Sequence, residues 1–182
     1  MSKKIHCLSA ALLLLLVTAG CVFTPYSKHE SAQYDLQVSA AAEPQNLFTI
    51  VSVCNSTPAG SKFFYRFNTN QIQTDPYRNW VQSPETMLQR YFMKRFPAGG
   101  KNTNPIEVKL EIITFEFDQK NSEAVVAYNY LLRKSEARQR GMISQRQKYI
   151  PSVDAMVKAM NNAVEAAAIE LLQNVEKFAA AK

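Results

Sequence analysis

Histidine is almost absent from this chain. The 182 residues contain two, His6 and His29, and neither lies beyond position 30. A Ser/His or Cys/His nucleophile pair and a histidine-based zinc site are therefore excluded from the rest of the sequence. The five glycines form no Gly-rich phosphate loop, and acids such as Glu107 and Glu111 alternate with apolar residues, as solvent-facing charges on a strand do. These absences predict a protein that is not an enzyme and uses no cofactor or metal.

Cysteine is scarce as well. The chain has three cysteines, and only Cys21 and Cys54 lie beyond the N-terminal apolar segment. Two cysteines in such different surroundings provide no disulfide framework. Cys54 ends an apolar run over 47–54, so we expect it to be a small buried hydrophobic residue.

The first 20 residues have the composition of a targeting signal. Lys3 and Lys4 precede an apolar run over 8–19. At ~1.5 Å per helical residue this run is roughly 18 Å long, too short to cross a hydrocarbon core of ~30 Å. Residues 1–20 are therefore predicted to be a cleaved signal peptide. Loss of its two lysines lowers the formal net charge of +6 by two, and the remaining mild excess is no nucleic-acid signature.

The end of the signal is informative in its own right. Ala19 and Gly20 directly precede Cys21, and this order resembles the lipobox of bacterial lipoproteins. The resemblance implies that Cys21 is the lipid-attachment residue, with 21–33 as the lipidated N-terminus and a flexible tether; two or three acyl chains anchor a protein stably. Val22 is not the aspartate that commonly retains such proteins at the inner membrane, so the resemblance favours the periplasmic face of the outer membrane. The alternative is a plain secretory signal with a chance cysteine.

Hydrophobic periodicity predicts one α/β domain over 34–182, with a mixed sheet of five or six strands and two packed helices. Strand signals fall at 34–38, 47–54, 63–67, 71–74, 106–117, 124–132 and 137–149. The run 47–54 is apolar almost throughout, which suits a central strand covered on both faces. A switch of the apolar phase predicts a bulge near Ile113.

Two helices have clear boundaries in the sequence. Ser83 and Pro84 begin the first, which is predicted to end at Phe96. Ser152 caps the second, a long alanine-rich helix whose apolar residues recur every three or four positions as far as Phe178. At ~1.5 Å per residue it spans roughly 40 Å, so we expect it to pack along the sheet or to overhang it.

The strands at 124–132 and 137–149 are predicted to form a basic hairpin that leaves the body of the sheet. Between positions 133 and 148 the sequence has one acidic residue, Glu136, and six basic residues: Arg133, Lys134, Arg138, Arg140, Arg146 and Lys148. Such charge is typical of a solvated edge strand that resists aggregation. It also suits a contact with anionic lipid head groups, at ~1 kcal/mol per cation, or with an acidic partner. The sequence leaves both interpretations open.

A second group of residues combines aromatic, basic and helix-start positions. Its members are Tyr65, Arg66, Tyr77, Arg78, Trp80, Pro84 and Leu88. Their order resembles the ABC-type transport auxiliary lipoproteins, the PqiC-like family of MCE lipid-transport systems, and the similarity covers about 21–178. The resemblance implies a fold like the N-terminal domain of TolB. It also implies structural roles for Tyr77, Arg78, Trp80, Pro84 and Leu88, with Trp80 as a core anchor at the helix entrance.

The resemblance further implies a function. We expect a lipoprotein on the outer membrane that assists an ABC/MCE-type envelope lipid-transport system by binding an MCE-domain protein and copies of itself. The alternative is a lipoprotein that regulates a cell-wall enzyme or assists outer-membrane assembly. A carrier that binds lipid inside the fold is a third interpretation.

Overall fold

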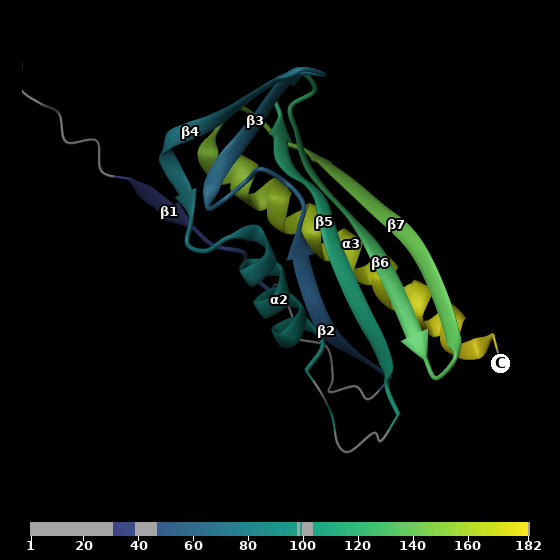
Figure 1. Cartoon of the computed structure of the whole chain (residues 1–182). Helices are drawn as coiled ribbons and strands as arrows, with labels where there is room; N and C mark the ends of the chain where they lie inside the picture. The colour runs from purple at the N-terminus through teal and green to yellow at the C-terminus, as the bar shows by residue number, and fades with distance from the viewer. Residues whose placement is uncertain (1–30, 39–46, 98, 100–103, 182) are drawn as a thin grey trace, which may run out of the picture. The chain divides into compact units, whose positions relative to one another are not determined.

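The computed structural model describes residues 31–38, 47–97, 99 and 104–181, so the predicted signal peptide and Cys21 lie outside the described residues. The elements are β1 (Ala32–Tyr34), β2 (Phe48–Asn55), β3 (Lys62–Asn68), β4 (Gln71–Trp80), α2 (Pro84–Arg95), β5 (Ile106–Asp118), β6 (Glu123–Lys134), β7 (Ala137–Lys148) and α3 (Val153–Ala180) (Figure 1). The predicted fold class, a single α/β domain with a mixed sheet and a long C-terminal helix, is confirmed.

Strand β5 organises the sheet. On one side it pairs antiparallel with β6 from Glu107 to Asp118. Its other side is shared, because β2 runs parallel to its first half and β3 parallel to its last two residues. The order across the sheet is β1-β4-β3-β5-β6-β7, with β2 beside β5. The register between β5 and β6 shifts between Ile112 and Thr114, which confirms the bulge predicted at this point.

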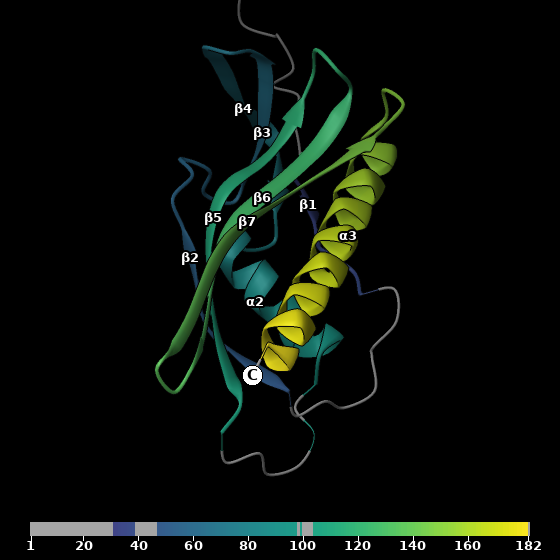
Figure 2. The ribbon, with the colours of Figure 1, turned by 90° about the vertical axis from the view of Figure 1, so that its right-hand side faces the viewer.

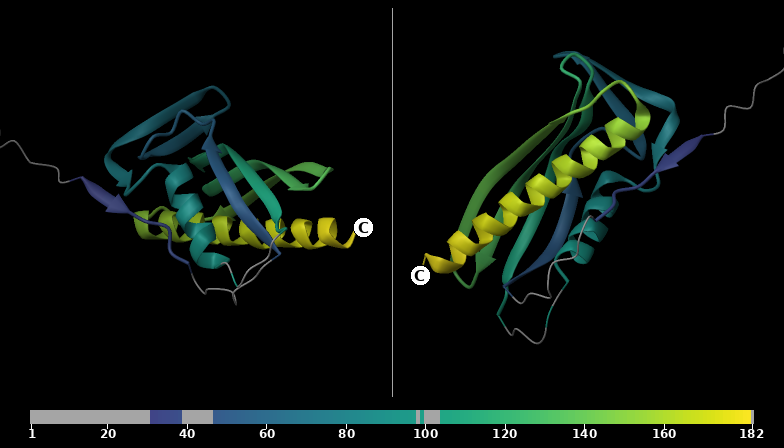
Figure 3. Two further views of the ribbon diagram at one scale, coloured as in Figure 1. Left: turned by 60° about the horizontal axis from the view of Figure 1, so that its bottom comes forward. Right: turned by 180° about the vertical axis from the view of Figure 1, so that it is seen from behind.

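The two described helices, α2 and α3, lie on the same face of the sheet (Figures 2 and 3). The apolar stripe of α3 is buried against β6 and β7, and the Tyr128 hydroxyl donates to the carbonyl of Ala167 over 2.7 Å. The two helices are also joined to each other, since Tyr91 and Arg95 of α2 both donate to the Glu165 carboxylate of α3. The Ser152 side chain accepts from the Ala155 N–H, as the predicted cap requires.

Within the described part of the chain the sheet has seven strands, one more than the largest number expected. The additional pairing comes from β4, which continues to Trp80 and holds β1 in parallel. The sequence predicts its first part, over 71–74, but the continuation over 75–80 contains Pro76 and has no apolar alternation to mark it. Strand β1 is shorter than expected and lies earlier, taking in two residues that the sequence assigned to the tether; Leu36 is buried beyond its end.

Two expectations about strand positions are wrong. The run containing Cys54 is not a central strand, because among the described strands β2 pairs only with β5. It is also not covered on both faces, because the side chains of Val51 and Cys54 are exposed. A continuous apolar run does not specify burial on two faces, and a register shift between Ile50 and Ser52 changes which side chains point inward. The basic hairpin does not leave the sheet, because β6 stays paired with β5 as far as Arg133.

Gly141 of β7 provides a test of the packing between β7 and β6. It lies directly opposite Tyr130, and a Cβ atom added to it would lie 2.4 Å from the Tyr130 hydroxyl oxygen. Tyr130 is itself buried, so its ring has little room to move. Gly141→Ala is therefore expected to lower the free energy of unfolding by about 1–3 kcal/mol in urea denaturation.

The matched control is Gly60→Ala, where an added Cβ atom meets nothing within 4 Å. This substitution should leave stability within about 0.5 kcal/mol of the parent. Equal effects at the two glycines would contradict the packing of Tyr130 over Gly141.

Candidate functional site

The face of the sheet opposite the helices carries most of the charge of the hairpin. Side chains alternate across a strand, so Tyr128 and Ile143 point toward α3, and their neighbours point away from it. We call this surface the open face. Its residues on β5, β6 and β7 include Glu107, Lys109, Glu111, Asn129, Leu131, Arg133, Arg138, Arg140, Met142, Arg146 and Lys148.

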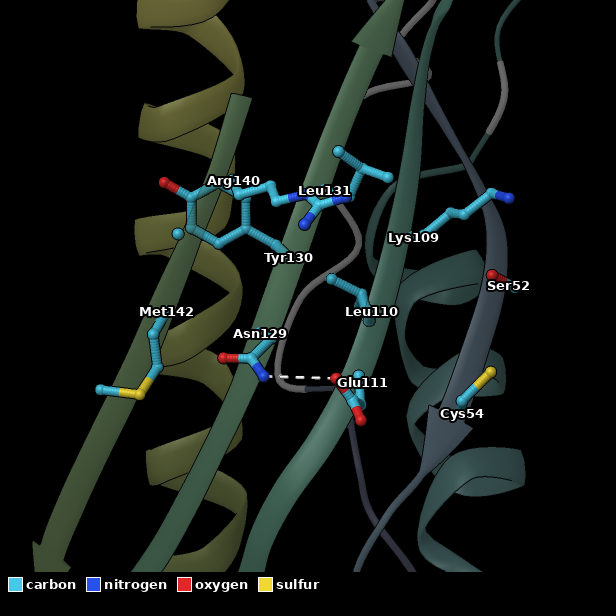
Figure 4. Close-up of a pocket in the computed structure, with 11 residues that line it drawn as sticks. Ser52, Cys54, Lys109, Leu110, Glu111, Asn129, Tyr130, Leu131, Arg140 and Met142 are labelled. Atoms are coloured by element: carbon cyan, nitrogen blue, oxygen red, sulfur yellow. Dashed lines mark hydrogen bonds between the residues drawn. The ribbon is translucent and has the colours of Figure 1, made fainter. Parts of the chain in front are cut away.

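A groove of about 710 Å³ crosses the open face (Figure 4). The strand registers arrange its walls in rows: Lys109, Leu131 and Arg140 form one row, and Glu111, Asn129 and Met142 form the next. Ser52 and Cys54 of β2 line the far side. The groove thus combines cationic side chains with apolar ones, and Met142 is 60% exposed.

Glu111 is the acid inside this groove. Its carboxylate accepts hydrogen bonds from the Ser56 hydroxyl at 2.7 Å and from the Asn129 amide at 3.2 Å. These bonds, first that from Ser56, lower the pKa of Glu111 below its ordinary value. Glu111 is therefore an ionised acceptor at neutral pH, not a proton donor.

The six basic residues predicted as contact residues differ in their ion pairing and in the side of the strand on which they lie. Arg133 pairs with Glu107 at 3.1 Å, while Arg146 and Lys148 both reach Glu123, at 3.2 and 3.0 Å. These ion pairs lower the pKa of Glu123, mainly through the hydrogen bond from Lys148. Lys134 follows Arg133 in β6, so it falls on the opposite side of the strand.

Three cations on the open face have no ion-pair partner among the described residues: Lys109, Arg138 and Arg140. Arg138 also lies directly opposite Arg133, a placement that is unfavourable for like charges. We call Lys109, Arg133, Arg138 and Arg140 the basic end of the open face. Its chemistry suits the binding of an anionic group.

The residues that carry the family resemblance lie elsewhere, at the β3–β4 hairpin. Tyr65 donates to the Asp75 carboxylate over 2.8 Å, and the Arg78 guanidinium reaches both Tyr65 and Asp75. The backbone N–H groups of Tyr77 and Arg78 also donate to Asp75. Four groups therefore converge on one carboxylate that is almost completely buried.

Asp75 holds this arrangement together and was missed from the sequence. Burial would raise its pKa, but the hydrogen bonds from Tyr77, Tyr65 and Arg78 and the charge of Arg78 outweigh burial and lower it. Burial raises the pKa of Tyr65 to about 12. The Asp-Pro dipeptide before an aromatic residue was an available signal, because an aspartate in a turn commonly accepts N–H groups two and three residues on.

Trp80 lies in the core beyond this hairpin. It is 2% exposed, and its ring centroid is 4.4 Å from that of Phe63 and 5.4 Å from that of Phe115. Pro84 and Leu88, at the start of α2, are buried as well. The Tyr77 side chain is different, since it is 49% exposed.

The described residues contain no group of three or more His, Cys, Asp or Glu side chains that could hold a metal ion. None of the helices in the described part of the chain has both the length and the hydropathy needed to cross a membrane.

Comparison with known proteins shows the fold of this chain. No family profile matches the sequence, and no curated protein does either. A crystal structure of an uncharacterized protein matches 81% of this chain and 98% of its own, with 13% identity and a TM-score of 0.65. Protein XCC0632 of Xanthomonas campestris, with the family designation DUF330, matches 78% of this chain and 92% of its own, with 15% identity and a TM-score of 0.56. At these identities the similarity concerns the fold alone.

Proposed function

We propose that this chain is a periplasmic lipoprotein, anchored in the outer membrane through Cys21, that assists an envelope lipid-transport system by binding partner proteins. The observation that carries the proposal is the open face. It is a sheet surface that neither described helix covers, and it presents cations without an ion-pair partner among the described residues beside exposed apolar side chains. Such a combination suits binding to another molecule.

The N-terminal sequence supports the anchoring part of the proposal. The small residues before Cys21 resemble a lipobox, and the ten residues 22–31 separate that cysteine from β1 in the sequence. Ten extended residues reach roughly 33 Å, so the domain would stay close to one membrane while its open face meets a partner. Sequence resemblance to the PqiC-like family supports an MCE-domain protein as that partner, together with self-association.

Crosslinking in cells tests the proposal. A photoreactive amino acid in place of Met142, on the open face, is expected to crosslink to an MCE-domain protein of the envelope, identified by mass spectrometry. The same probe in place of Met93, which is 65% exposed on α2, serves as the matched control and should give no such product. Cys21→Ser should abolish the incorporation of labelled palmitate.

Crosslinks of equal yield from positions 93 and 142 would show that the open face is not the surface that binds the partner. Capture of a cell-wall enzyme or an outer-membrane assembly protein from Met142, with no MCE-domain protein, would favour the alternative function. Palmitate incorporation that survives Cys21→Ser would contradict the anchor.

A further inference from the structure

We propose that the outer edge of β7 binds an extended acidic segment of the partner protein, which adds to the sheet as a strand beside Arg138 and Arg140. This inference rests on the proposed function, because it states what kind of partner segment the open face holds. For a segment that runs parallel to β7, the order of Arg138, Arg140 and Met142 calls for two acidic residues at positions i and i+2 and an apolar residue at i+4, all on the side of the open face.

The first argument is the edge itself. Strand β7 is last in the order of the sheet, and among the described strands it pairs only with β6. All twelve of its residues are in continuous register with β6, without a bulge that would twist the edge away. A long regular edge presents a row of backbone donors and acceptors, which is the template that strand addition uses.

The second argument is the spacing of the charges. Arg138 and Arg140 are two residues apart on one strand and project from the same face, at a separation of about 6.8 Å. An added strand has the same repeat, so carboxylates at alternate positions would lie beside both guanidinium groups. Met142 continues the series and is largely exposed, which favours an apolar residue at the next alternate position.

The third argument is that the charge is unbalanced at only one end of the strand. Arg146 and Lys148 are paired with Glu123, and Arg146 also lies 3.8 Å from Asp118. Arg138 and Arg140 have no such partner among the described residues, and Arg133, which lies opposite Arg138, is already paired with Glu107. Cations that only protect an edge would not need this asymmetry, whereas an acidic segment would neutralise the two arginines of β7 that have no anionic partner.

A second copy of the chain fits this edge poorly. If two β7 strands paired antiparallel about Ile143, Arg138 would face Lys148 and Arg140 would face Arg146 of the other copy. Like charges directly opposite each other destabilise a strand pair. The charge pattern therefore favours an acidic partner over a dimer through β7.

A designed peptide tests the inference with the purified full chain. The probe is the acetylated and amidated heptapeptide TETETLT, whose two glutamates and leucine share one face of an extended strand. Its matched control is TEETTLT, which has the same composition and charge but places the glutamates on opposite faces. We expect the control to bind at least about fivefold more weakly in calorimetry, and binding of TETETLT to slow amide exchange in β7.

Charge reversal provides the second arm. Arg138→Glu with Arg140→Glu replaces two attractive cross-strand pairs by two repulsive ones, so we expect at least about a tenfold loss of affinity for TETETLT. The control is Lys94→Glu with Lys158→Glu, an equal change of charge at exposed positions on α2 and α3, which should bind the peptide like the parent.

Equal affinity for the two peptides, or unchanged amide exchange in β7, would show an electrostatic contact without strand addition and would overturn the inference. So would absence of peptide binding, with or without binding to vesicles of phosphatidylglycerol. In each of these cases the crosslink from position 142 to an MCE-domain protein can still be found, so the inference can fail while the proposed function stands. Absence of that crosslink would instead contradict the proposed function.

Discussion

Trp80→Ala is expected to lower the free energy of unfolding by about 3–5 kcal/mol, because a large aromatic side chain leaves the centre of a packed cluster. The indole ring contacts Phe63, Phe115 and Phe117, which come from two different strands of the sheet. Surrounding rings cannot close a cavity of that size without moving β3 or β5. Single domains commonly have only 5–15 kcal/mol of stability, so urea denaturation should show a large shift of the midpoint.

Two further variants keep this prediction testable if Trp80→Ala fails to fold. Trp80→Phe retains one ring and should lose clearly less stability than the alanine variant. Tyr77→Ala removes an aromatic residue three positions away that is half exposed, and it should cost less than about 1 kcal/mol. Equal losses at Trp80 and Tyr77 would contradict the placement of Trp80 as the anchor of the core.

Asp75→Asn is expected to destabilise the protein by about 1–3 kcal/mol at pH 7, because a buried carboxylate that accepts four hydrogen bonds is replaced by a weaker acceptor. The effect should depend on pH. The folded protein holds the pKa of Asp75 below its ordinary value of about 3.9, so Asp75 contributes its full stability above that value. The contribution is lost as the pH falls through the lowered pKa.

The difference in unfolding free energy between the parent and Asp75→Asn should therefore be constant from pH 7 to about 5 and shrink below about pH 4. Urea denaturation at several pH values measures it. Asp118 and Glu123 also have lowered pKa values, so both proteins should still lose some stability in acid.

Tyr65→Phe is the control: it removes one hydrogen bond from Asp75 and keeps the carboxylate, so the stability of this variant should retain the acid dependence of the parent. A parent and an Asp75→Asn variant that differ equally at every pH would refute the role of Asp75.

Helix boundaries and the bulge were predictable because their signals are local. Ser83 with Pro84 marks a helix start through neighbouring residues alone, and the apolar phase switch near Ile113 lies within one strand. The exposure of Cys54 was not predictable. The exposure of Cys54 depends on a register shift within β2 and on which strands pair with β2. Both depend on pairing with β5, whose residues are more than 50 positions away in the sequence.

The candidate site divides in the same way. The sequence alone determined that no histidine lies beyond position 30, that the first residues resemble a lipoprotein signal and that Arg138 and Arg140 are two residues apart on β7. Those are properties of composition and of spacing along the chain. Only the tertiary structure decided which cations are neutralised, because Glu107 and Glu123 reach Arg133 and Arg146 through strand pairing between distant segments. It also placed both described helices on one face of the sheet, which leaves Arg138 and Arg140 on the open face, and it put β7 last in the order of the sheet.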